Sequence, residues 1–137
     1  MAKASRQIFV NLPVADLKRA MAFFATLGFE FNPTFTNDQG ACMVVNEHAC
    51  VMLLVQPFFE TFTRKGLCDT RDRIEAINAF SVASRAEVDD VYERAIGAGG
   101  QPAIEPQDYG FMYSRSFQDL DGHHWEVLWM DPAAAAA

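Results

Sequence analysis

The spacing of apolar residues changes along the chain and predicts strands and helices in turn. Residues 6–14 are apolar and β-rich, which predicts a strand. A helix is predicted next, because apolar residues recur at helical intervals at Leu17, Ala20, Met21, Phe24 and Leu27. Asp16 occupies the expected N-cap of this helix, and Gly28 ends it. Three short strands are predicted after it, at residues 29–31, 41–46 and 49–55.

The second half of the chain repeats this order of elements. Residues 77–84 predict a strand, and Ser84 and Glu87 have the spacing of a capping box at the start of a helix. The apolar stripe of that helix is Val88, Val91, Tyr92, Ala95 and Ile96. After a run of glycines, strands are predicted at residues 101–105, 111–117 and 125–130. The chain therefore contains an internal repeat of about half its length.

The repeat predicts an α+β fold of two paired βαβββ modules, each a curved sheet with one helix on its back. Module 1 spans residues 6–56, a charged linker spans 57–75, and module 2 spans 76–131. Together they are expected to form one domain at residues 1–132, followed by a disordered tail at 133–137. The helix-free faces are expected to enclose a cavity, and cavities between sheets are common ligand sites.

Charge and composition exclude two classes of partner. The net charge is −7 and the basic residues are scattered, so neither nucleic acid nor an anionic membrane is an expected partner. No apolar run approaches the length of about 20 residues needed to span a bilayer, and residues 1–10 lack a signal-peptide core. A cytoplasmic location is expected, with Cys42, Cys50 and Cys68 as reduced thiols.

Two adjacent histidines and a glutamate near the end of the chain raise the question of a metal site. Strand alternation places His124 and Glu126 on one face, and His123 and Trp125 on the other. Because the histidines follow an Asp-Gly turn, they are expected to be exposed residues beside the turn, and Trp125 is expected in the core. His124 and Glu126 alone supply only part of a metal site.

Two stretches carry a resemblance to a known family: NLPVADLKRAMAFFATLGFEF (11–31) and SFQDLDGHHWEVLW (116–129). They resemble the vicinal-oxygen-chelate superfamily, which includes glyoxalase I, fosfomycin and bleomycin resistance proteins and extradiol dioxygenases. The second stretch resembles the family's terminal hairpin, with Leu120 in place of the usual proline. The resemblance covers residues 6–131 and is nearest to the glyoxalase-like, predicted lactoylglutathione lyase branch. It implies the fold, and a lyase if the chain is an enzyme, but the superfamily hosts many reactions and some members only bind.

The resemblance also implies where a metal would sit. In metal-dependent members, four strands each supply a His, Glu or Gln to a divalent cation that stabilises an enolate-like charge. These positions fall on Phe9, on Met52 (Leu54 if the register slips), on Ile77 and on Glu126. Only Glu126 matches, so neither a metal nor another cofactor is expected.

The expected cavity lining follows from these positions and from strand alternation. The catalytic candidate is Glu126, either a general base with a raised pKa or a carboxylate that only anchors structure or ligand. Phe111, Tyr113, Arg115 and Phe117 are expected on the helix side of their strand. The other expected lining residues are Phe9, Asn11, Met52, Ile77, Ser114, Ser116 and His124.

Three functions remain open from the sequence. The missing metal ligands favour a protein that binds a small, largely apolar ligand without metal; the others are a glyoxalase-type lyase or isomerase and a drug-sequestering resistance protein. An acidic pocket that is open to solvent and formed across two chains would favour the last, since bleomycin-type drugs are cationic. The resemblance further implies a homodimer, because half-open cavities in the family are completed at a dimer interface. Three linker side chains, Phe58, Phe59 and Phe62, suit such an interface or the mouth of a cavity.

Overall fold

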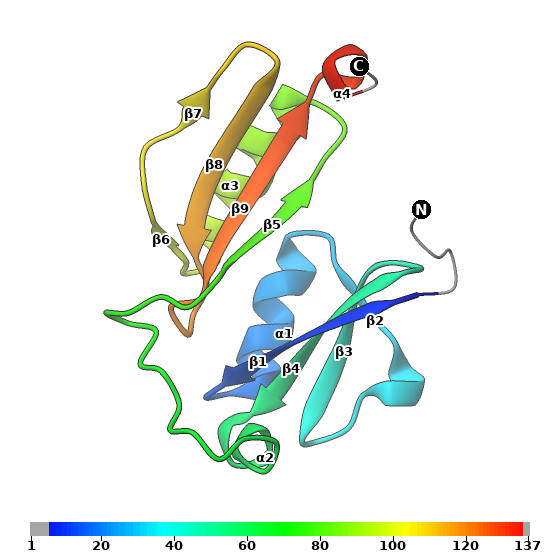
Figure 1. Cartoon of the computed structure of the whole chain (residues 1–137), viewed down its shortest axis with the longest axis vertical. Coiled ribbons are helices and arrows are strands. Elements are labelled where there is room, and N and C mark those ends of the chain that lie inside the picture. The colour runs from blue at the N-terminus through cyan, green and yellow to red at the C-terminus, as the bar shows by residue number, and fades with distance from the viewer. Residues whose placement is uncertain (1–5, 136–137) are drawn as a thin grey trace. The chain divides into compact units, whose positions relative to one another are not determined.

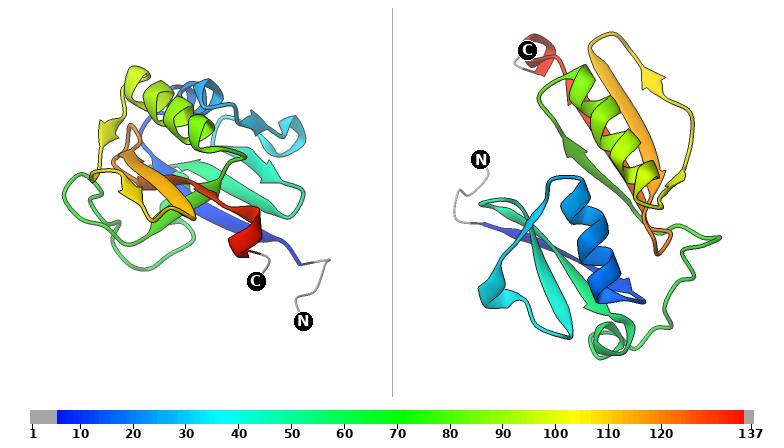
Figure 2. Two further views of the ribbon diagram at one scale, coloured as in Figure 1. Left: turned by 90° about the horizontal axis from the view of Figure 1, so that it is seen from above. Right: turned by 180° about the vertical axis from the view of Figure 1, so that it is seen from behind.

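The computed structural model describes residues 6–135, and these fall into two compact units that divide between residues 67 and 68. Each unit is a sheet with one long helix on one face (Figures 1 and 2). The two sheets have four and five strands. The predicted mixed α+β class is confirmed. None of the described helices is both long enough and apolar enough to cross a membrane.

Unit 1 has the strand order β1-β4-β3-β2, with β1 parallel to β4 and the other pairs antiparallel. Its elements are β1 (Ile8–Val14), α1 (Leu17–Thr26), β2 (Glu30–Phe31), the 3-10 turn η1 (Pro33–Phe35), β3 (Gly40–Asn46), β4 (Ala49–Val55) and α2 (Gln56–Glu60). The Asp16 carboxylate caps α1 by accepting a hydrogen bond from the Arg19 N–H at 3.1 Å. Gly28 has a φ of +98°, which favours glycine at the end of the helix.

The core of unit 1 lies between α1 and the sheet. Alternate strand residues face the helix and are fully buried, among them Val14, Met43 and Leu53. Phe24 of α1 is 1% exposed, and Phe23 beside it, which the helical stripe did not include, is also buried. The opposite face of the sheet is left free of α1.

Unit 2 has the strand order β5-β9-β8-β6, with β5 parallel to β9 and a further short strand, β7, paired with β8. Its elements are β5 (Ile77–Ser81), α3 (Arg85–Gly97), β6 (Gln101–Pro102), β7 (Gln107–Asp108), β8 (Met112–Gln118), β9 (His124–Met130) and α4 (Pro132–Ala135). Ser84 caps α3 by accepting from the Glu87 N–H at 3.1 Å. The Glu87 carboxylate accepts from Ala83, one residue before the predicted capping-box partner.

Arg115 occupies the helix side of β8, as predicted, and is held there by charge. Its guanidinium lies 3.2 Å from the Asp89 carboxylate and 3.4 Å from that of Glu93, both on α3. It also stacks 3.7 Å from the centroid of the Tyr92 ring. A charged residue is therefore accommodated beneath a helix because the helix supplies its counter-ions.

Three predictions about the strands and the C-terminal end of unit 2 differ from the structure. The strand predicted at residues 101–105 is observed only at Gln101–Pro102, and a second short strand follows outside the predicted range, at Gln107–Asp108. Pro102 and Pro106 have no N–H to donate to a continuous ladder. Phe111 does not pack beneath α3 but is 51% exposed, since it precedes β8 and follows the turn at Gly110. Residues 133–135, predicted as disordered tail, belong to α4, and residues 136–137 lie outside the described part of the chain.

Candidate functional site

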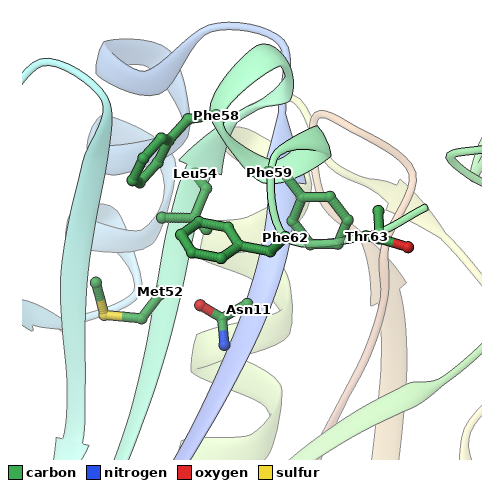
Figure 3. A pocket seen from close by; sticks show the side chains of 7 residues that line it. All are labelled: Asn11, Met52, Leu54, Phe58, Phe59, Phe62 and Thr63. Atoms are coloured by element: carbon green, nitrogen blue, oxygen red, sulfur yellow. The ribbon is translucent and has the colours of Figure 1, made fainter. Parts of the chain in front are cut away.

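A pocket of about 570 Å³ lies on the face of the unit 1 sheet that α1 leaves free (Figure 3). Asn11 and Met52 are register partners on β1 and β4, and both point away from α1 because Leu12 and Leu53, one residue along, are buried beneath it. The full lining is Asn11, Met52, Leu54, Phe58, Phe59, Phe62 and Thr63. Two of the sequence-predicted cavity residues, Asn11 and Met52, are thus brought together.

The remaining wall of the pocket is α2 and the residues that follow it. Pro57 lies in the first turn of this helix, where its missing N–H costs no hydrogen bond, so the chain turns directly out of β4. The Phe58 and Phe62 rings pack edge to face with centroids 5.0 Å apart. Phe62 remains 68% exposed at the rim, whereas Phe58 and Phe59 are half-buried.

The chemistry of the pocket is apolar, with two neutral polar groups. The Asn11 amide donates a long hydrogen bond of 3.3 Å to the Phe9 carbonyl. The Thr63 hydroxyl accepts from the Lys65 N–H at 3.0 Å. No lining residue is charged. Such a surface can exclude water from an apolar ligand and orient one polar group of it, but it offers no acid or base.

The four positions that the resemblance assigns to metal ligands have matching registers in the two units. Phe9 lies two residues before Asn11, the partner of Met52, and Ile77 lies two residues before Ala79, the partner of Glu126. Phe9 and Ile77 are 52% and 56% exposed. The correspondence carried over from the resemblance is therefore consistent within the internal repeat, and three of its four side chains are apolar.

The other predicted site residues share the free face of the unit 2 sheet. Ser116 pairs with Glu126, and Ile77 pairs with His124. Ser114 and Ser116 are each only 3% exposed, and the Ser116 hydroxyl accepts from the Ile104 N–H at 3.2 Å. Glu126 is half-buried, and among the described residues no hydrogen bond or ion pair to its carboxylate is found. These residues belong to a different unit from the pocket, so a cavity shared by both sets stays a prediction.

A smaller hollow of about 250 Å³ lies within unit 2, where the segment 70–74 crosses the turn between β8 and β9. The Thr70 hydroxyl donates to the Asp121 carbonyl and fastens the segment there. His124 lines this hollow beside Arg71 and Arg73. Arg71 forms an ion pair with Asp69, with 2.9 Å between the guanidinium and the carboxylate. This guanidinium lowers the pKa of Asp69 to about 2. The hollow is lined by both acidic and basic side chains. Residues 71–74, which form one side of it, are exposed to solvent.

Sequence reasoning missed Asp119, and it misplaced His123. Asp119 is 5% exposed and His123 is 6% exposed, so the prediction of an exposed histidine beside the turn is wrong. The Asp119 carboxylate accepts from the N–H of Asp121 (2.9 Å), the N–H of His123 (3.0 Å) and the Trp125 indole (3.0 Å). Burial raises the pKa of Asp119, while His123 and the donated hydrogen bonds oppose that rise. The Asp-x-Asp-Gly spacing signals a turn, but nothing in it signals burial.

Within residues 6–135, no group of three or more His, Cys, Asp or Glu side chains is arranged to hold a metal ion. On β9, His124 is the one other His, Cys, Asp or Glu that lies on the same strand face as Glu126.

Comparison with family models gives a match to the first part of unit 1. A family model described as bleomycin resistance protein-like N-terminal matches residues 6–46, which run from β1 through β3. No curated protein matches the sequence significantly.

Solved structures match nearly the whole chain. A hypothetical protein from S. aureus is 27% identical with a TM-score of 0.77, over 93% of this chain and 95% of that one. A glyoxalase/bleomycin resistance protein/dioxygenase family enzyme from Burkholderia phytofirmans is 17% identical with a TM-score of 0.74, over 89% and 96%. A fosfomycin resistance protein from Listeria monocytogenes is 21% identical with a TM-score of 0.65, over 93% and 94%. At these identities, the last two bear on the fold alone.

Proposed function

We propose that this chain, which belongs to the vicinal-oxygen-chelate superfamily and has the glyoxalase/bleomycin-resistance fold, binds a small, largely apolar ligand in the pocket of unit 1. The observation that carries the proposal is the lining of that pocket. Five of its side chains are apolar or aromatic and two are neutral polar groups, Asn11 and Thr63. This composition is typical of small-molecule sites.

The volume and the polar groups narrow the class of ligand. A pocket of about 570 Å³ is large enough for a bicyclic molecule. Its rings would contact Phe59 and Phe62, and a hydroxyl or carbonyl would reach Asn11. An anionic ligand would find no cation on the lining, and a cationic ligand would find no carboxylate.

We further propose that the ligand binds without the superfamily's divalent cation. Support comes from Phe9, Met52 and Ile77, because aromatic and aliphatic side chains donate no electron pair and a thioether is a soft ligand. With Glu126 alone, a hard or borderline dication would be held weakly. The residues present do not fit the metal-dependent chemistry.

The two alternative functions have less support. A glyoxalase-type lyase needs the cation that these residues do not fit. A resistance protein that sequesters a cationic, bleomycin-type drug needs carboxylates where the pocket has none. A drug-binding role would thus require a largely neutral, apolar drug.

The binding proposal predicts that Phe62→Ala weakens the binding of an apolar aromatic probe, whereas a substitution outside the pocket does not. With 2-naphthol as the probe, we expect about a tenfold rise in Kd, corresponding to about 1.4 kcal/mol of lost aromatic contact. The Kd is measured by titration followed by two-dimensional NMR, with the largest shifts expected at Asn11 and Thr63. Metal content is measured on the same sample, purified without added metal.

The matched control is Phe35→Ala, since Phe35 is similarly exposed (64%) in unit 1 but does not line the pocket. Its Kd should equal that of the unaltered protein. Equal affinities of all three proteins would contradict the binding site. Stoichiometric nickel, zinc or manganese that is lost on Glu126→Gln would contradict the metal-free proposal.

A further inference from the structure

Three sulfur-bearing side chains gather on the free face of the unit 1 sheet. Cys50 and Met52 are two residues apart on β4 and therefore share a face. Cys42 on β3 is the register partner of Met52, and it lies diagonally across from Cys50, whose own partner is Val44. The register therefore places the three side chains at neighbouring positions of one sheet face, and Met52 is also part of the pocket wall.

The two thiols are close enough for Cys50 to affect the ionisation of Cys42. Cys42 is 3% exposed, and its pKa is raised by burial and further by the neighbouring Cys50 thiol. Cys50 is half-buried, and Cys68, in the loop 67–69, is exposed. Met52 extends its thioether to the β3 side of β4, towards the strand that carries Cys42 (Figure 3). Both cysteines are free thiols in the structure.

Two neighbouring thiols can form a disulfide or bind a metal ion together, and the strand register favours one of these. A disulfide needs Cβ atoms about 3.5–4.5 Å apart, whereas diagonal residues on antiparallel strands lie about 7–8 Å apart, somewhat less between Cβ atoms. A bridging ion adds two metal–sulfur bonds of about 2.3 Å each to the span. The diagonal placement therefore suits a metal bridge better than a disulfide.

We propose that Cys42 and Cys50 bind a Cu(I) ion as a bridging pair of thiolates, with the Met52 thioether as a weaker third ligand. Thiolate and thioether are soft ligands, which select Cu(I) over hard dications. The ion would enter from the pocket, where Met52 is accessible. This site is separate from the inherited metal position at Glu126 and does not depend on the ligand proposed above.

Binding is an exchange of ions and needs no oxidant or reductant. Each thiol loses its proton to solvent as its sulfur binds the metal, so two protons are released and the copper stays Cu(I). The bound unit then carries one net negative charge. Burial of Cys42 disfavours a free thiolate there, which makes the metal the natural counter-ion for that charge.

The experiment is an anaerobic competition in which bathocuproine disulfonate, a coloured Cu(I) chelator, donates Cu(I) to the full-length, reduced protein. We expect one Cu(I) per chain, and Cys50→Ala should weaken binding by at least about 100-fold, since even residues that only orient ligands cost 10–100-fold. Met52→Leu keeps the side-chain volume and should weaken binding by about tenfold. Cys68→Ala is the matched control and should bind like the unaltered protein.

Folding is checked by urea unfolding of every variant, and Cys50→Ala is the principal one because Cys50 is only half-buried. Loss of Cu(I) binding on Cys68→Ala, or its retention on Cys50→Ala in a folded protein, would overturn the site. Mass analysis of protein oxidised in air provides a second readout. A Cys42–Cys50 disulfide that forms readily would overturn the inference from register, whereas persistence of both thiols supports it.

Discussion

At the scale of single residues, Asp119 illustrates how one buried carboxylate organises the turn between β8 and β9. Its two oxygens accept three N–H groups, from Asp121, His123 and the Trp125 indole. A buried carboxylate without such partners would be costly, and each partner without the carboxylate would be an unpaired buried donor. The turn and the core residue Trp125 are therefore linked through a single side chain.

Asp119→Asn is predicted to destabilise the protein by about 2–3 kcal/mol. An amide offers only one acceptor oxygen, so its NH₂ group would face either the Trp125 indole or the two backbone donors. Urea unfolding followed by tryptophan fluorescence measures the loss, and the Trp125 indole N–H resonance should shift with it. Asp72→Asn, on the exposed segment 71–74, serves as control. Equal unfolding midpoints for the two variants would show that the network contributes nothing.

At the scale of elements, segment 70–74 is fixed to the β8–β9 turn by close contact of two backbones. A Cβ at Gly122 would lie 2.5 Å from the Thr70 carbonyl oxygen, and the φ of Gly122 is +86°. Gly110 has a similar φ of +79° but open space around its missing Cβ. Substituting each glycine in turn therefore distinguishes the cost of a positive φ, which both positions share, from the cost of a steric clash, which arises only at Gly122.

Gly110→Ala is predicted to cost about 1–2 kcal/mol, the usual penalty of a left-handed residue. Gly122→Ala carries the same penalty and must also push Thr70 away, so its loss should be roughly twice as large. It should also expose segment 69–75 to proteolysis, because the Thr70–Asp121 hydrogen bond is lost. Urea midpoints and limited proteolysis measure both effects. Similar losses and unchanged cleavage for the two variants would argue against the anchoring contact.

At the scale of the whole molecule, each unit leaves one sheet face free of its helix, and apolar side chains remain exposed on those faces. Phe9 and Ile77 are more than half exposed, and so is Phe62 at the pocket rim. Exposed aromatic and aliphatic groups of this kind favour association. We therefore propose a homodimer in which a second copy covers part of these surfaces.

Light scattering is expected to give the mass of two chains, and Phe62→Asp should shift the protein towards the monomer. Each chain carries a net charge of −7, so added salt should strengthen association by screening repulsion between copies. Phe35→Asp tests whether any new charge on unit 1 has the same effect, and it should leave the dimer intact. A monomer mass at every protein and salt concentration would end the proposal.

The sequence alone predicted most helices and strands of both units, because the spacing of apolar residues and the capping residues act within a short stretch of chain. Asp16 and Gly28 bound α1 as predicted, and β4 begins and ends at the predicted residues, 49 and 55. Alternation along β8 and β9 correctly placed Ser116 and Glu126 on one face. It also placed Arg115 beneath α3, although only the structure shows the acidic partners that stabilise it there.

What only the tertiary structure decided depends on which segments cover which residues. Burial of His123 and Asp119 follows from the folding of the turn around a carboxylate, and turn-forming residues are normally exposed. The pocket requires α2 to fold back over β1 and β4, and the Cys42–Cys50 pair requires the register of β3 on β4. Sequence periodicity determines the faces of each element, whereas register and packing between elements determine which of those faces meet.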